Sequence, residues 1–280
     1  MIQSICVCGA GTMGIGIAQV SAQSGFNTIL YDVNEEILNK AKDIISRSLD
    51  VFIGKSKIRV EDKSVIEDRI QFVTDINSCT ADLVIEAIIE RLEAKRVLFQ
   101  RLSSINNNET IFATNTSSLS ITEIADALPF PERIAGMHFF NPAHIMKLVE
   151  IVHGNQTNEK TIRAIFSVSE RMGKTAVLCK DAPGFIVNHV ARPYYLEALK
   201  LVELGITDIE TIDHLMEATG FKMGPFRLMD LIGNDINYAV SCSVYEAMNK
   251  SQRLEPSPMQ QEKVKRGELG RKTGKGYYSY

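Results

Sequence analysis

The stretch IQSICVCGAGTMG, residues 2–14, joins a short apolar run to three glycines spaced as G-x-G-x-x-G. Apolar residues then recur at helical spacing as far as Val20, so the pattern predicts a strand, a glycine-rich turn and a helix. Gly9 would permit the tight turn, Gly11 would let the backbone approach a pyrophosphate, and Gly14 would let the helix pack closely. Alone, the motif is weak evidence for a dinucleotide site.

The next strand strengthens this interpretation. Residues 27–31 form a second apolar run that ends at Asp32, eighteen residues past Gly14. An acidic side chain at this point can hydrogen-bond the ribose of adenosine. It would also repel a 2′-phosphate, and residues 33–35 offer no Arg to receive one, so the sequence predicts NAD rather than NADP. The structural alternative is an Asp that caps the following helix.

Helices and strands continue to alternate after Asp32. A helix capped by Asn34 should end near Gly54, and its apolar face is predicted to contain Ile37, Ala41, Ile44, Ile45 and Leu49. Further strands are expected over 70–74, 82–87 and 110–113, and a helix over 91–105 whose apolar face includes Val97, Leu98 and Leu102. Ligands sit at the carboxyl ends of the strands in such a sheet, which places Ser117 near a site. A helix N-cap is the common structural alternative for this serine.

Residues 134–152, IAGMHFFNPAHIMKLVEIV, contain the His and Glu with the best local case for reactivity. Asn141-Pro142 separates two apolar runs, and proline disfavours a helix there, so we expect strand, turn, strand and an approach of His138 to Glu150. In an extended second run, one face carries Met146, Leu148, Glu150 and Val152. A buried carboxylate needs a partner, and on an imidazole it stabilises the imidazolium formed in proton transfer. A structural His beside an edge-strand Glu is the alternative.

A helix is expected over 158–172 and a strand over 175–179, and from residue 185 onward the chain has only helical patterns. We place the domain boundary at residues 181–184 and predict domains over 1–183 and 184–280. Helices are expected over 185–204 with a kink at Pro193, over 207–219 with a capping box of Thr207 and Glu210, and after Gly224-Pro225. The predicted fold is α/β, a Rossmann-type doubly wound sheet followed by an all-helical C-terminal domain. Such a domain commonly supplies substrate walls and a subunit interface.

Composition narrows the classes of partner. The net charge of −3 and the pI near 6.0 give no general attraction to nucleic acid or to anionic membranes. Five cysteines without a C-x-x-C pair are expected to be reduced thiols, which suits a cytoplasmic protein. Met1 leads almost directly into a strand-like run, so we expect no leader peptide, and no apolar run approaches a membrane span. The five histidines lack a paired metal-ligand spacing, so no metal is expected.

The sequence resembles the 3-hydroxyacyl-CoA dehydrogenase family over essentially its full length, and in particular the short bacterial enzymes that act on 3-hydroxybutyryl-CoA. The resemblance rests on seven stretches. They are the loop at 9–14, NTSSL at 115–119, HFFNP at 138–142, MKLVE at 146–150, PGFIVN at 183–188, MGP at 223–225 and GRKTG at 270–274.

This resemblance implies roles for individual residues. His138 matches the catalytic base and Glu150 its partner, while Ser117 and Asn188 match the polar groups around the substrate oxygen. Positions expected to contact NAD are Gly9, Gly11, Thr12, Met13, Gly14, Asp32, Glu90, Lys95, Asn141 and Lys272, and positions near CoA are Ser48 and Lys55. A homodimer formed largely through the helical domain is also implied. One departure is His144, where the family usually has a small residue or proline.

The implied reaction is the reversible oxidation of an (S)-3-hydroxyacyl-CoA, with hydride passing from C3 to the nicotinamide and a proton passing to His138. A longer or dicarboxylic substrate, such as 3-hydroxyadipyl-CoA, is an open alternative. A sister class that acts on free β-hydroxyacids resembles a site with a catalytic Lys, where this chain has Gly184 four residues before Asn188. A non-catalytic nucleotide-binding protein, of the kind found among lens crystallins, would not need His138 and Glu150.

Overall fold

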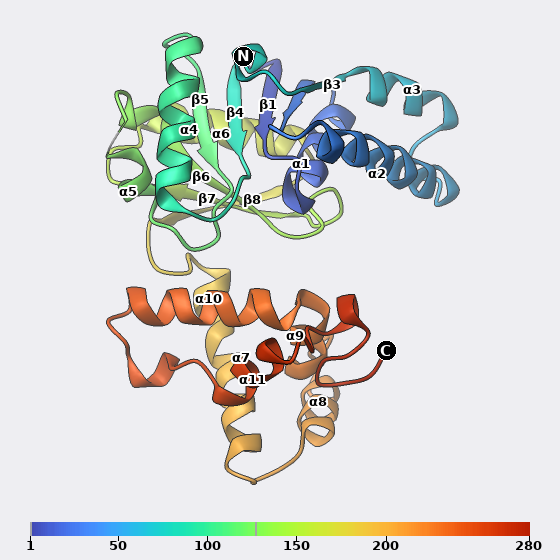
Figure 1. The fold of residues 1–280 in the computed structure, drawn as a ribbon, viewed down its shortest axis with the longest axis vertical. Coiled ribbons are helices and arrows are strands. Elements are labelled where there is room, and N and C mark those ends of the chain that lie inside the picture. The colour runs from blue at the N-terminus through green and yellow to red at the C-terminus, as the bar shows by residue number, and fades with distance from the viewer. Residues whose placement is uncertain (1, 127) are drawn as a thin grey trace. The chain divides into compact units, whose positions relative to one another are not determined.

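The computed structural model describes residues 2–126 and 128–280, which form two compact units, Met1–Asp181 and Ala182–Tyr280 (Figure 1). Within these described residues, no helix has the length and apolar character needed to cross a membrane.

The first unit is built on a sheet that has eight strands within the described residues, in the order β3-β2-β1-β4-β5-β6-β7-β8 (Figure 1). Their bounds are Ser4–Cys8 for β1, Asn27–Tyr31 for β2, Ile70–Val73 for β3, Leu83–Glu86 for β4, Ile111–Thr114 for β5, Ile134–Phe139 for β6, Leu148–His153 for β7 and Thr175–Lys180 for β8. β6 and β7 pair antiparallel, and the other neighbours pair in parallel. The order 3-2-1-4-5-6 reverses beside β1, as in doubly wound dinucleotide folds, and confirms the predicted Rossmann-type sheet.

Helices lie on both faces of this sheet (Figure 1). They are α1 Thr12–Gln23, α2 Glu35–Gly54, α3 Val60–Asp68, α4 Leu92–Ile105, α5 Ile121–Ala125 and α6 Glu159–Arg171, with short 3-10 turns η1 Ile76–Ser78 and η2 Pro131–Arg133. Ile5 and Val7 of β1 belong to the core formed with α1, α2 and α6. Because side chains alternate along a strand, Cys6 and Cys8 point to the opposite face, where they are also buried. Burial on both faces explains the continuous apolar run of β1.

Two helices bury faces that differ from the predicted ones. On α2, Ile37 and Ile44 are 37% and 44% exposed, and Val97 on α4 is 62% exposed. The buried positions are Leu38, Ala41, Ile45, Leu49 and Phe52 on α2, and Lys95, Phe99 and Leu102 on α4. The sequence offers apolar residues on both sides of each stripe, and the angle at which the helix meets the sheet selects one side.

The second unit is helical, as predicted. Its elements are α7 Val187–Glu203, α8 Ile209–Ala218, α9 Pro225–Ile232, α10 Asn234–Ala247 and α11 Pro258–Lys265, with 3-10 turns η3 Gln252–Leu254 and η4 Arg271–Thr273. The predicted capping box at Thr207 and Glu210 is wrong. Asp208 is the N-cap of α8, and its side chain accepts a hydrogen bond from the backbone N–H of Thr211 at 2.8 Å. Aspartate caps helices at least as well as threonine, so the helix begins one residue later than the box requires.

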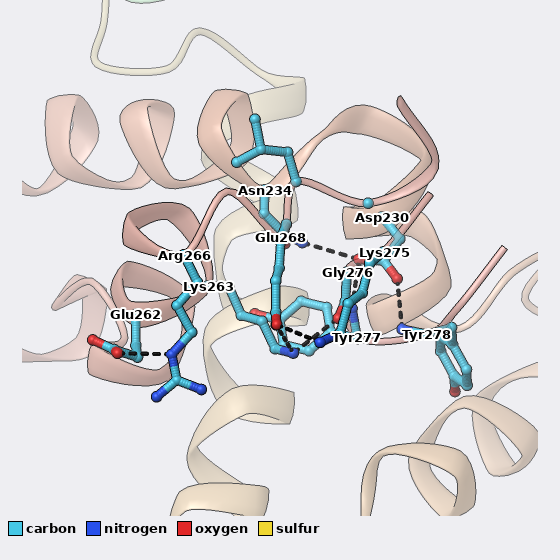
Figure 2. Close-up of polar contacts among 12 residues, drawn as sticks. Asp230, Asn234, Glu262, Lys263, Arg266, Glu268, Lys275, Gly276, Tyr277 and Tyr278 are labelled. Atoms are coloured by element: carbon cyan, nitrogen blue, oxygen red, sulfur yellow. Dashed lines mark hydrogen bonds and ion pairs between the residues drawn. The ribbon is translucent and has the colours of Figure 1, made fainter. Parts of the chain in front are cut away.

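A buried carboxylate anchors the C-terminal segment (Figure 2). Asp230 is 1% exposed and accepts hydrogen bonds from the backbone N–H groups of Tyr277 and Tyr278, both at 2.9 Å. Gly270 passes so close that an added Cβ would lie 2.2 Å from the backbone oxygen of Asp230. These contacts fix the turn at residues 270–274, which contains Lys272, one of the residues predicted to contact NAD.

Candidate active site

The pairing of β6 with β7 brings the predicted catalytic pair together. His138 and Glu150 are partners in the antiparallel register, and His138 Nδ1 lies 2.7 Å from Glu150 Oε2. Their side chains are 7% and 1% exposed. A carboxylate at Nδ1 favours the tautomer in which Nδ1–H donates to Glu150, and this makes Nε2 the nitrogen that accepts a proton. Met146 does not share the Glu150 face as predicted, because it precedes β7 and is 41% exposed.

The glycine-rich loop has the geometry of a phosphate cradle. A Cβ added to Gly9, which has a φ of +102°, would lie 2.6 Å from the backbone oxygen of Ala87, and one added to Gly14 would lie 1.7 Å from that of Gly9. At Gly11, no atom of the described residues lies within 4 Å of an added Cβ. Gly11 is also the N-cap of α1, and no described side chain caps this helix. The backbone there can therefore be approached by an anion that meets the N–H groups of the first turn.

Asp32 lies beside this loop. Its Oδ2 accepts a hydrogen bond from the backbone N–H of Ala10 at 2.9 Å, and its Oδ1 accepts one from that of Asn34 at 3.0 Å. The N-cap of α2 is Asn34, as predicted, so the alternative of a capping role for Asp32 is wrong. The carboxylate joins the end of β2 to the glycine loop, where a ribose would lie in this fold.

Three charged side chains, Glu86, Glu90 and Lys95, join the end of β4 to the first turns of α4. Lys95 Nζ is 2.7 Å from Glu86 Oε1 and 3.0 Å from Glu90 Oε2, and the Lys95 and Glu86 side chains are 1% and 0% exposed. Burial raises the pKa of Glu86 despite the neighbouring ammonium. Burial also acts to raise the pKa of Glu90, but Lys95 and local hydrogen bonds outweigh it and lower that pKa. Because Lys95 is so deeply buried, we infer that its predicted role toward the dinucleotide is exerted through Glu90.

The segment after β5 is held by Glu90 and by β6. Glu90 Oε1 accepts a hydrogen bond from the backbone N–H of Ser117 at 3.1 Å. Asn115 Oδ1 accepts one from the backbone N–H of Phe139 at 2.9 Å, which ties this segment to the strand that carries His138. The structure therefore places Ser117, which follows β5, at the same carboxyl edge of the sheet as His138, which lies near the end of β6.

Lys174 anchors the loop between β6 and β7. It is 8% exposed, and its Nζ donates hydrogen bonds to the backbone oxygens of Ala143 at 2.5 Å and Met146 at 2.7 Å. This loop carries Asn141, a predicted NAD contact, which is exposed. Burial lowers the pKa of Lys174 to about 8. Sequence reasoning missed this lysine, because 31 and 28 residues separate it from its two acceptors and no local pattern marks it.

The lowered pKa of Lys174 gives a testable dependence of stability on pH. Its ordinary pKa is 10.5, so between pH 8 and 10.5 the unfolded chain binds more protons and the free energy of unfolding rises with pH. Below pH 8 this gain is absent. We expect the wild type to gain roughly 1–2 kcal/mol over the Lys174→Met variant across this window, after allowance for solvent screening. Urea unfolding at the two ends measures the difference, with Lys147→Met as an exposed control. Parallel pH profiles for wild type and Lys174→Met would contradict the assignment.

His144, the departure from the family pattern, lies in the loop between β6 and β7 and packs against helices α1 and α2. A Cβ added to Gly16 of α1 would lie 3.4 Å from His144 Nδ1, and the imidazole ring is 5.7 Å from the ring of Phe52 on α2. Lys57 Nζ lies 5.1 Å from that same phenyl centroid. Burial, with the charges of Lys174 and Lys57, lowers the pKa of His144, and its buried Nδ1 has no hydrogen-bond partner among the described residues. Burial and the two nearby cations therefore both favour the neutral form of this imidazole.

The predicted CoA positions lie on the face of α2 that meets this histidine. Ser48, Phe52 and Lys55 are spaced by four and three residues, so they share one side of the helix. Ser48 is half-buried, and Lys55 is exposed at the C-cap. The contact between Phe52 and His144 thus places the predicted CoA positions near the loop that follows His138.

Two predicted site residues belong to the second unit. Asn188 is half-buried near the start of α7, and its backbone oxygen accepts a hydrogen bond from Arg192 Nε at 3.1 Å. Lys272 lies in the anchored turn, with its Nζ 2.6 Å from Asp235 Oδ1 and its side chain 43% exposed. Their roles toward substrate and NAD stay predictions.

Two family models together match nearly the whole chain. Residues 4–182 match the model described as 3-hydroxyacyl-CoA dehydrogenase, NAD binding domain, and residues 184–280 match that described as 3-hydroxyacyl-CoA dehydrogenase, C-terminal domain.

Individual relatives agree with the family models. The chain is 46% identical over its full length to the 3-hydroxyadipyl-CoA dehydrogenase of Escherichia coli K12, but it spans only 59% of that protein. It is 40% identical to a probable 3-hydroxybutyryl-CoA dehydrogenase of Deinococcus radiodurans, with 98% of this chain and 99% of the relative covered. The crystal structure of (S)-3-hydroxybutyryl-CoA dehydrogenase PaaH1 from Ralstonia eutropha matches with a TM-score of 0.95 at 36% identity, covering 100% of this chain and 99% of that one.

Proposed function

The chain belongs to the 3-hydroxyacyl-CoA dehydrogenase family, and from this premise we propose that it catalyses the NAD-dependent, reversible oxidation of an (S)-3-hydroxyacyl-CoA to the 3-ketoacyl-CoA. The observation that carries the proposal is the buried contact of 2.7 Å between His138 Nδ1 and Glu150 Oε2. A pair of this kind supplies a ring nitrogen that can accept a proton and a charge that stabilises the protonated ring.

In the proposed reaction, His138 Nε2 takes the proton of the C3 hydroxyl during oxidation and returns it during reduction. Glu150 accepts the hydrogen bond from Nδ1–H throughout, so its negative charge stabilises the imidazolium. Ser117 and Asn188 orient the substrate oxygen, which contributes through positioning rather than through proton transfer.

The residues of the first unit fit NAD. The open backbone at Gly11 and the first turn of α1 suit a pyrophosphate, and Asp32 suits a ribose that lacks a 2′-phosphate. Bound there, NAD supplies the acceptor for the hydride that leaves C3. Thr12 and Met13 would offer backbone N–H groups, and Glu90 would face the same edge of the sheet.

Oxidation of NADH by acetoacetyl-CoA tests the proposal directly. We expect turnover with NADH and little with NADPH, because Asp32 repels a 2′-phosphate. NADH binding without turnover on acetoacetyl-CoA or any longer 3-ketoacyl-CoA would reject the activity and would favour a nucleotide-binding role.

Glu150→Gln tests the partner of the base. The amide can still accept the hydrogen bond but carries no charge to stabilise the imidazolium, so we expect kcat to fall about 10²–10³-fold while the Kd of NADH changes little. Steady-state kinetics and fluorescence titration with NADH measure the two effects. A strong loss of NADH binding with normal turnover would contradict this role for Glu150.

The acyl group is proposed to be short, as in 3-hydroxybutyryl-CoA, because a 40% identical relative that is covered over 99% of its length is named for this substrate. A 46% identical relative acts by its name on 3-hydroxyadipyl-CoA, so this dicarboxylic substrate is the second candidate. His144 packs against Phe52, and Lys57 Nζ lies over the ring of that phenylalanine, which supports this candidate because a hydrogen-bond donor near a cation can hold a carboxylate. The ratio of kcat/KM for acetoacetyl-CoA and 3-ketoadipyl-CoA, in wild type and His144→Pro, decides between them.

A homodimer formed through the helical unit is also proposed. Several large apolar side chains of this unit are exposed, including Val190, Leu204, Leu215, Phe221, Leu231 and Ile236. Apolar surface of this kind is expected where two subunits meet. The molecular mass in solution tests the proposal. A cytoplasmic location stays a prediction, because relatives 40% identical to this chain include mitochondrial enzymes.

A further inference from the structure

Three cysteines with no part in the proposed reaction meet in the core of the first unit. Cys6 and Cys8 alternate on β1, so their side chains share one face, and Cys79 follows η1 and enters the same space. All three residues are 0% exposed. Their sulfur atoms all lie within 4.8 Å of one another, with 3.8 Å between those of Cys6 and Cys8.

This spacing suits a thiophilic ion bound by three sulfurs. A metal–sulfur bond of about 2.3 Å places three sulfurs about 4.0 Å apart when they surround an ion in one plane. Among the described residues, the cluster contains Cys6, Cys8 and Cys79 and no fourth His, Cys, Asp or Glu. Structural zinc almost always takes four ligands, whereas soft Cu(I) is selected by thiolates, so the geometry favours Cu(I).

We propose that Cys6, Cys8 and Cys79 form a binding site for a soft monovalent cation of the Cu(I) class. When Cu(I) passes from a chelator to the cluster, its bonds to the chelator break as bonds to the sulfurs of Cys6, Cys8 and Cys79 form, any proton carried by a coordinating thiol passes to the buffer, and no electron is transferred. Cys79 lies in a connection between η1 and β4, so local opening of this connection admits the ion.

The site is coupled to the dinucleotide loop. Cys8 directly precedes Gly9, whose tight turn lies against Ala87 after β4. An ion that draws β1 toward Cys79 displaces this turn, because close packing leaves the backbone little room to adjust. Bound Cu(I) is therefore expected to weaken NADH binding, which would make the protein sensitive to copper independently of its substrate.

The test is an anaerobic titration of the full chain with Cu(I) supplied as its bicinchoninate complex, in which loss of the chelate colour reports transfer. We expect a single Cu(I) per chain for wild type and transfer at least about tenfold weaker for Cys79→Ser and Cys6→Ser. Cys179→Ser and Cys242→Ser, each at a half-buried cysteine outside the cluster, are the matched controls and should bind as wild type does. NADH titration of the Cu(I)-loaded protein then measures whether bound copper weakens NADH binding, as the proximity of Cys8 to Gly9 predicts.

X-ray absorption of the loaded wild type keeps the proposal falsifiable if cluster variants fail to fold. Three sulfur neighbours at about 2.3 Å are expected. No transfer from the chelate, equal transfer to Cys79→Ser, or nitrogen and oxygen neighbours in place of sulfur would each overturn the proposal. These outcomes are independent of turnover on acetoacetyl-CoA, so failure of the copper site and failure of the proposed function can be told apart.

Discussion

His138→Gln is expected to lower kcat about 10²–10⁴-fold, which is the range that a general acid or base contributes. The glutamine amide can still donate a hydrogen bond to Glu150, whose Oε2 lies 2.7 Å from Nδ1 in the wild type. The glutamine side chain cannot take up the proton of the substrate hydroxyl. A fall in kcat in this variant therefore reports the loss of proton transfer and not a change in the packing of β6 against β7.

Pre-steady-state reduction of acetoacetyl-CoA by NADH measures this effect, and NADH titration shows whether the dinucleotide site is intact. His138→Ala should lose at least as much activity. His153→Ala, a half-buried histidine at the end of β7, is the matched control and should remain near the wild-type rate. Retention of more than about a tenth of the wild-type kcat in His138→Gln would reject His138 as the acid and base.

Lys95→Met is expected to give the largest loss of stability, about 3–5 kcal/mol at neutral pH, because it leaves the buried Glu86 carboxylate without its ammonium. Glu86 also accepts hydrogen bonds from Thr114 Oγ1 at 2.7 Å and from the backbone N–H of Ile88 at 2.8 Å, which only partly offset this loss. Glu90 loses the same partner, so the segment that holds Ser117 should loosen and NADH binding should weaken.

The loss should depend on pH in a defined direction. Burial already raises the pKa of Glu86 in the wild type, and removal of Lys95 raises it further. A raised folded-state pKa gives stability that is present at low pH and is lost as pH rises through that value, so the variant should be closest to wild type near pH 5 and weakest near pH 8.

Urea unfolding across this pH range tests the expectation. Lys160→Met is the matched control, because Lys160 pairs with Glu109 at the surface, where the two side chains are 76% and 77% exposed. Its effect should stay within about 1 kcal/mol. Equal unfolding midpoints for Lys95→Met and Lys160→Met at pH 8 would show that the buried triad does not stabilise the sheet.

Much of the site could be predicted because its signals are local. The glycine spacing, the strand that ends at Asp32 and the proline turn between two apolar runs each lie within one short segment. Alternation along strands then placed His138 and Glu150 on one side of a hairpin, and the register confirms that they are partners. Ser117 follows from the rule that strands of a parallel sheet present their carboxyl ends together.

The features that sequence reasoning missed are those made by long-range pairing. Lys174 and its acceptor Ala143 are 31 residues apart, and Cys79 meets Cys6 across more than seventy residues. A periodic pattern limits which residues share a face, but it carries no information about which distant residue lies opposite.

The sequence by itself thus determined the class of fold, the glycine-rich loop and the approach of His138 to Glu150, because period, turn chemistry and motif spacing act over a few residues. Tertiary structure alone decided which side of α2 is buried, that Lys95 is enclosed between Glu86 and Glu90, and that three cysteines converge beside the glycine loop. These outcomes depend on how helices dock on the sheet, where close packing selects one arrangement among several that the local pattern allows equally.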